Sequence, residues 1–183
     1  MPEWATRLIA ELDSSDEHAR KLLSELSEQQ LNWQPAEGAW SIGQCLEHLC
    51  KTNDVYLSPI AQALEGKPKK SVAEITPGWF GAWFIRSFIE PSPNQKRGPA
   101  PAKIVPAPHV TPSVLERFLT GNDEARKLIQ QASECDVNRI RFRNPFIPVI
   151  RFTVGTGFEI VTKHQKRHLL QAERVKEAAS FPK

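Results

Sequence analysis

Proline is unevenly distributed along this chain of 183 residues, and its distribution separates helical from non-helical segments. Nine of the fifteen prolines fall between residues 65 and 112. A proline inside a helix removes a backbone hydrogen bond and clashes with the preceding turn, so this segment cannot form one continuous helix. The flanking sequence repeats apolar residues at spacings of three and four. We therefore expect helices on both sides of a proline-rich insertion at about residues 65–111.

Four stretches with amphipathic spacing predict four helices. In each, one face of a helix with 3.6 residues per turn is apolar and the opposite face is polar. The predicted helices cover residues 3–26, 41–64, 111–129 and 156–179. Within the first, Ser14-Ser15-Asp16 would also suit the start of a shorter helix. Four helices with two long connections predict an all-α four-helix bundle with crossover connections, formed by a single domain over residues 1–183.

Local signals mark the ends of two of these helices. Ser41 and Gln44 have the spacing of a capping box, in which each side chain binds the other residue's free backbone N–H. Gly66 and Pro68 then favour a helix end near Leu64. The pair Thr111-Pro112 combines an N-cap residue with proline at the first helical position, which predicts the start of the third helix.

Aromatic residues are concentrated inside the insertion, after Thr76-Pro77. Five aromatic residues follow at helical spacing: Trp79, Phe80, Trp83, Phe84 and Phe88. They predict a short helix whose side chains cover the core of the bundle. A roof over a functional pocket, a dimer face and a membrane-contacting surface are the alternatives. We expect residues 91–110 to run extended over the surface, which makes His109 a loop residue rather than a ligand.

Residues 139–154 connect the third and fourth predicted helices and alternate as a β-strand does. Pro145 and Pro148 would each remove a ladder hydrogen bond from such a strand. We therefore interpret this segment as an extended crossover.

Composition excludes several classes of protein. The formal net charge is only +3, which gives no reason to expect a nucleic-acid partner. No stretch approaches the roughly 20 apolar residues of a membrane-spanning helix, and charged residues near the start argue against a signal peptide. The cysteines Cys45, Cys50 and Cys135 are odd in number and form no CxxC motif, so they cannot close a complete disulfide framework. We expect a soluble cytoplasmic protein.

Three histidines predict a metal site. His164 and His168 are four residues apart, so their side chains point the same way on consecutive turns of a helix. His48 borders the apolar stripe of the second predicted helix. Burying three imidazoles without partners is costly, whereas a divalent cation uses their lone pairs. Three histidine ligands also leave one coordination position open, as in catalytic zinc sites.

Other interpretations of these histidines remain open. Gln165 follows the first histidine of the pair, where the HExxH motif of metalloproteases has glutamate, so that class is disfavoured. An isolated HxxxH pair more often belongs to ordinary surface or capped histidines. The lesser alternative for His48 is a core position in which a backbone carbonyl accepts its proton.

Several residues near the predicted site are candidates for contact with a ligand or substrate. They are Gln44, Thr52, Arg167 and Gln171. The glutamines lie one turn from a histidine, although such side chains more often satisfy neighbouring polar groups. Arg167 would attract an anionic carboxylate, unless it belongs to a solvated basic face. Cys45 is a further thiolate candidate, but a single buried cysteine usually behaves as a small apolar residue.

Three stretches together resemble the DinB/YfiT superfamily, a damage-inducible metal-binding family. They read LNWQP at residues 31–35, GAWSIGQCLEHL at 38–49 and HQKRHLLQA at 164–172. The resemblance spans almost the whole chain and implies a four-helix bundle with a divalent metal held by three histidines. These map to His48, His164 and His168, so all three ligands are present.

The resemblance also implies a range of activities. Some relatives are transferases and isomerases that use the low-molecular-weight thiols bacillithiol or mycothiol, and many have no known activity. We therefore expect a metal-dependent enzyme on a small substrate, with thiol transfer favoured over hydrolysis. The alternative is a non-catalytic, metal-stabilised binding or interaction module. Three imidazoles accept Zn, Ni, Fe, Co or Mn, and the resemblance favours a homodimer.

Overall fold

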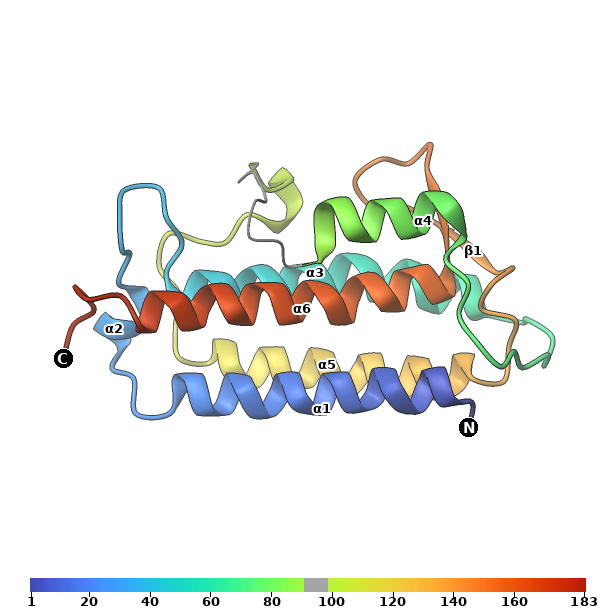
Figure 1. The fold of residues 1–183 in the computed structure, drawn as a ribbon, viewed down its shortest axis with the longest axis horizontal. Coiled ribbons are helices and arrows are strands. Elements are labelled where there is room, and N and C mark those ends of the chain that lie inside the picture. Colours follow the sequence, from blue (N-terminus) through green and yellow to red (C-terminus); the bar gives the residue numbers. More distant parts are fainter. Residues whose placement is uncertain (91–98) are drawn as a thin grey trace.

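The computed structural model describes residues 1–90 and 99–183, and these are predominantly helical (Figure 1). The long helices are α1 (Glu3–Leu23), α3 (Ile42–Leu64), α5 (Val114–Ala132) and α6 (Val154–Lys176). Shorter elements are α2 (Glu28–Asn32), α4 (Gly78–Phe84), the π-helix η1 (Ile85–Ile89), the 3-10 helix η2 (Ala102–Ile104) and the strands β1 (Arg141–Arg143) and β2 (Arg151–Thr153). The predicted all-α class is confirmed.

The four long helices lie side by side. Helices α1 and α3 each pack against both α5 and α6. Helices α3 and α5 run in the same direction in Figure 1, so the chain between them has to return along the length of the molecule. The described part of that return segment contains α4, η1 and η2, of which η1 contacts α6 and η2 contacts α3. It thereby covers the face on which the histidines lie.

The capping signals of α3 are confirmed. The Ser41 hydroxyl accepts a hydrogen bond from the Gln44 N–H, and the Gln44 side chain accepts one from the Ser41 N–H. The helix ends at Leu64, and Gly66 has a positive φ of 64°, which glycine adopts without strain. Helix α1 continues through Ser15 and ends at Leu23, so the shorter alternative is wrong.

Other helix boundaries differ from the predicted ones. Helix α5 begins at Val114, and Ser113 occupies its N-cap position, so the Thr111-Pro112 pair precedes the helix by one turn. Helix α6 covers Val154–Lys176, and the Thr153 hydroxyl caps it by accepting a hydrogen bond from the Thr156 N–H. Helix α2 is not among the predicted helices because it spans only five residues.

The interpretation of residues 139–154 as a plain crossover is wrong, because they contain an antiparallel hairpin. Strand β1 pairs with β2 in a register that places Phe142 opposite Phe152. Both phenylalanines are buried. Pro145 and Pro148 lie in the loop between the strands, where no ladder hydrogen bond is lost.

The aromatic segment forms α4 and η1, but only part of it covers the core. Phe80 and Phe84 pack against Phe152 of β2. Trp79 is 83% exposed, and Trp83 and Phe88 are also exposed. Full burial of this cluster was therefore the wrong expectation. The extended course expected for residues 91–110 falls partly outside the described residues, and within the described part η2 interrupts it.

Two apolar clusters fill the space between the long helices, and buried amides separate them. Asn53, Asn122 and Gln165 come from α3, α5 and α6 and hydrogen-bond to one another. Asp16 of α1 accepts a further bond from Asn122 at 2.6 Å and also pairs with Arg126. This amide network joins all four long helices at one level. No helix in the described part of the chain has the length and apolar character needed to cross a membrane.

Candidate metal centre

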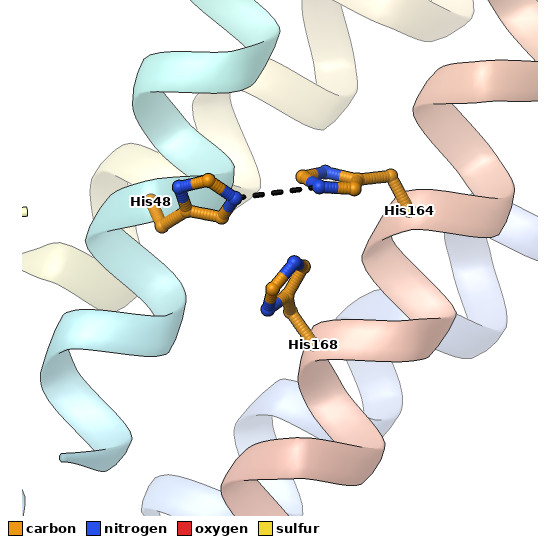
Figure 2. Close-up of side chains that lie close together, drawn as sticks. All are labelled: His48, His164 and His168. Atoms are coloured by element: carbon orange, nitrogen blue, oxygen red, sulfur yellow. Dashed lines mark hydrogen bonds between the residues drawn. The ribbon is translucent and has the colours of Figure 1, made fainter. Parts of the chain in front are cut away.

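Three histidine side chains converge between α3 and α6 (Figure 2). His48 comes from α3, while His164 and His168 come from consecutive turns of α6. Each ring offers a nitrogen, and the three nitrogens lie within 4.8 Å of one another. The His48 and His164 Nε2 atoms are 3.3 Å apart. This spacing is short enough for one small cation to contact all three rings.

Burial keeps these imidazoles neutral. Their exposed fractions are 2% for His48, 8% for His164 and 6% for His168. Desolvation lowers the pKa of His48 to about 4 and that of His168 to about 3, and it also lowers the pKa of His164 well below 6.5. All three rings therefore keep a free lone pair at neutral pH, which is the form that binds metals.

Hydrogen bonds fix which nitrogen of two rings carries the proton. The Ile104 carbonyl in η2 accepts from His48 Nδ1 at 2.7 Å, and the Gln171 amide oxygen accepts from His168 Nδ1 at 3.0 Å. A carbonyl oxygen only accepts, so both Nδ1 atoms are protonated. The lone pairs are then on the Nε2 atoms. Such outer partners commonly orient histidine ligands of metals.

His164 has an unpaired polar atom. Its Nδ1 is buried and has no hydrogen-bond partner in residues 1–90 and 99–183. Leaving a buried nitrogen unpaired costs free energy. Such a nitrogen is expected only where another interaction of the same ring compensates for that cost. Three neutral, convergent imidazoles with two fixed tautomers form a donor set that fits a divalent cation.

Two of the candidate neighbours, Gln44 and Thr52, hydrogen-bond to backbone groups rather than to the histidine rings. Gln44 is occupied by its capping box, and its amide also donates to the Ala107 carbonyl at 3.1 Å. The Thr52 hydroxyl donates to the His48 carbonyl at 2.7 Å, within α3 itself. Gln44 therefore fixes the start of α3 and the return segment, and Thr52 bonds along the helix.

The other two candidates act on the histidines directly. Gln171 accepts the His168 proton, as described above. Arg167 donates to the Phe88 carbonyl, and its positive charge contributes to the lowered pKa values of all three histidines. Cys45 is fully buried in an apolar cluster, and burial raises the pKa of its thiol to about 12, so it stays an uncharged core residue.

Two contributions to the site were missed by sequence reasoning. Trp40 packs on His48 and His168, with ring centroids 4.7 and 5.8 Å away. The sequence did offer a signal for Trp40, because it directly precedes the N-cap Ser41. The chain that enters α3 must pass the first turns of that helix, which carry His48. The Ile104 carbonyl carries no side-chain signal, since any residue supplies a backbone oxygen.

Comparison with known proteins finds a family match and one distant relative. The family model for the DinB superfamily matches residues 11–172. The chain is 26% identical over 157 residues to the uncharacterized protein YuaE of Bacillus subtilis strain 168, covering 85% of this chain and 88% of that protein. No solved structure matches the chain.

Proposed function

Because the chain belongs to the DinB superfamily, we propose that His48, His164 and His168 bind one divalent metal ion and that the protein is a metal-dependent enzyme. The observation that carries the proposal is the convergence of three buried, neutral imidazoles on one point. Imidazole nitrogen suits Zn, Ni, Fe, Co and Mn. Three protein ligands leave room for a substrate or water on the ion.

The reaction we favour is thiol transfer to a small electrophilic substrate. When bound, a divalent ion lowers the pKa of a coordinated thiol, so that a low-molecular-weight thiol cosubstrate is available as its thiolate at neutral pH. The sulfur then forms a bond to the electrophilic carbon, and the leaving group departs with its bonding electrons. The thiol proton passes to solvent.

Arg167 and Trp40 supply the protein's own contributions to this reaction. The positive charge of Arg167 lowers the pKa of all three histidines, and it would attract a carboxylate of the thiol cosubstrate. Trp40 covers His48 and His168, which excludes water from one side of the rings. Lower water content strengthens the attraction between the guanidinium and an anion.

Hydrolysis is less well supported by the side chains present. A metal-dependent hydrolase commonly uses a carboxylate as general base beside the attacking water. Within the described residues, the cluster contains histidines alone. The buried Glu47 is engaged with the Ala107 N–H and lies beside Lys51 and Arg117.

A non-catalytic interaction module is the second candidate, and one observation favours it. Trp79, Trp83 and Phe88 expose large aromatic surfaces on α4 and η1. Exposed aromatics of this kind occur at interfaces with other proteins. In that case the ion would stabilise the fold beneath the contact surface, and thiols would not be consumed.

Elemental analysis of tag-free protein tests the proposal. We expect about one divalent ion per chain in the wild type and almost none in His48→Ala, because three ligands are the usual minimum for tight binding. His109→Ala is the matched control, since His109 is exposed and pairs with Glu28. Metal-loaded protein is then incubated with thiols and a chlorodinitrobenzene electrophile. Equal metal content in the three proteins would reject the site, and bound metal without thiol consumption would favour the interaction module.

A further inference from the structure

A cavity of about 600 Å³ lies at the far end of α3 from the histidines. Gln62 and Ala63 form part of its wall. Gln62 lies fourteen positions after His48 in the sequence, which corresponds to about 21 Å along a helix. The cavity is therefore separate from the proposed metal centre. Its volume falls within the range of small-molecule sites.

The walls of this cavity are strongly basic. Its cationic side chains are Lys67, Lys70, Arg139, Arg141 and Arg151. They come from the segment after α3 and from the hairpin and its approach, so the fold gathers them from distant parts of the sequence. The one carboxylate in the wall belongs to Asp136, which lies 3.6 Å from Arg139. Within the described residues, the other four cations have no ion-pair partner.

The hairpin register gives independent support for an anionic ligand. Its buried face carries Phe142 and Phe152, while its other face carries three arginines, Arg141, Arg143 and Arg151, together with Thr153. Arg143 lies directly opposite Arg151. Like charges at opposed positions destabilise a two-stranded sheet, and no carboxylate in the described chain pairs with them. Of the two, Arg151 lines the cavity, and an anion bound beside it would weaken that repulsion.

We infer that this cavity binds a phosphate-bearing anion with more than one phosphate group. Four unpaired cations exceed what a single phosphate requires, and arginine's planar fork donates two parallel hydrogen bonds to phosphate oxygens. The same phosphate chemistry occurs in soluble polyphosphate compounds and in anionic lipid headgroups. The size of the cavity favours a soluble ligand, and the experiment separates the two sources.

Calorimetric titration with sodium tripolyphosphate at about 0.15 M salt tests the inference. We expect binding by the wild type and at least about a ten-fold weaker affinity in Arg141→Gln/Arg151→Gln, because two charge-assisted hydrogen bonds are lost. Arg20→Gln/Arg174→Gln is the matched control, since both arginines are exposed and lie away from the cavity. Its affinity should change less than about two-fold.

Co-sedimentation with phosphatidylglycerol–phosphatidylcholine vesicles identifies the source of the phosphate. Vesicle binding that is lost in the cavity variant, without tripolyphosphate binding, would assign the site to a lipid headgroup. Tripolyphosphate binding without vesicle binding would assign it to a soluble ligand. Failure of both probes to bind the wild type, or equal loss in the control variant, would overturn the inference. Metal content is unaffected in either case, so this test is independent of the proposed function.

Discussion

His48 and His164 bring their Nε2 atoms to within 3.3 Å of each other, although 116 positions separate them in the sequence. Two neutral rings at this distance either share one proton or direct both lone pairs at a third atom. The Ile104 carbonyl fixes the His48 tautomer, which leaves the His48 Nε2 lone pair pointing at its neighbour. The position of a backbone oxygen on the return segment therefore determines what the cluster can bind.

Gln171 is expected to tune metal affinity through His168. In Gln171→Leu the His168 Nδ1–H loses its acceptor, so the ring is no longer held in the tautomer and orientation that present Nε2. Losses of such outer partners commonly weaken metal binding about 10- to 100-fold. Competition titration with a chromogenic chelator measures the change. Gln131→Leu, on the exposed surface of α5, is the control and should bind as the wild type does.

The metal-free protein should lose stability as the pH falls from 6.5 towards 4. Below 6.5 the unfolded chain protonates its histidines, whereas burial holds the folded pKa of His48 at about 4 and of His168 at about 3. The histidines' contribution to the free energy of unfolding is therefore constant above pH 6.5 and decreases through that window, by about 3 kcal/mol for His48 alone. Urea unfolding at a series of pH values measures it. The decrease should be smaller in His48→Gln and unchanged in His109→Gln, and identical curves for both would contradict the assignment.

Gly157→Ala is expected to destabilise the protein, although alanine favours helices by about 1 kcal/mol over glycine. A Cβ at this position of α6 would lie 2.7 Å from a ring carbon of Phe142 and 2.8 Å from Ile60 Cδ1. Overpacking of a dense core costs typically about 1–3 kcal/mol. We expect thermal unfolding at a lower temperature than in the wild type. A variant at least as stable as the wild type would show that the hairpin does not pack against α6 in this way.

The thiols of Cys45 and Cys50 should be unreactive in the native state. Burial raises the pKa of each thiol to about 12, so neither forms appreciable thiolate at pH 8. In a Cys135→Ser background we expect negligible reaction with an aromatic disulfide reagent until guanidinium is added. Both thiols should then react. Rapid reaction of the folded protein would mean that α3 is more accessible than its packing indicates.

Local signals predicted α3 well because they act over a few residues. Ser41 and Gln44 bond to each other's backbone whatever the rest of the chain does, so the start of the helix is readable from sequence. The hairpin was missed because prolines were judged without knowing where the chain turns. Pro145 and Pro148 are compatible with two strands only because each strand has three residues and both prolines fall between them.

The histidine side chains of the candidate site could be predicted from the sequence, but the backbone groups that orient them could not. Three histidines at helical positions suffice to propose a cluster, since helix geometry fixes which of them share a face. The Ile104 oxygen reaches His48 only because the return segment folds over α3, and no residue type encodes that contact. The exposure of Trp79 has the same origin, because it depends on which face of α4 meets the hairpin.

The amide network of Asn53, Asn122 and Gln165 has a consequence for how the histidines come into place. Gln165 follows His164 directly in α6, and Asn53 lies five positions after His48 in α3. Sliding α6 past α3 by one helical turn would move Gln165 about 5.4 Å and leave buried amides without partners. The network thus fixes the register of α6 relative to α3. An incoming ion would meet imidazoles that already lie at the same level along the two helices. Metal binding would therefore require no separate folding step.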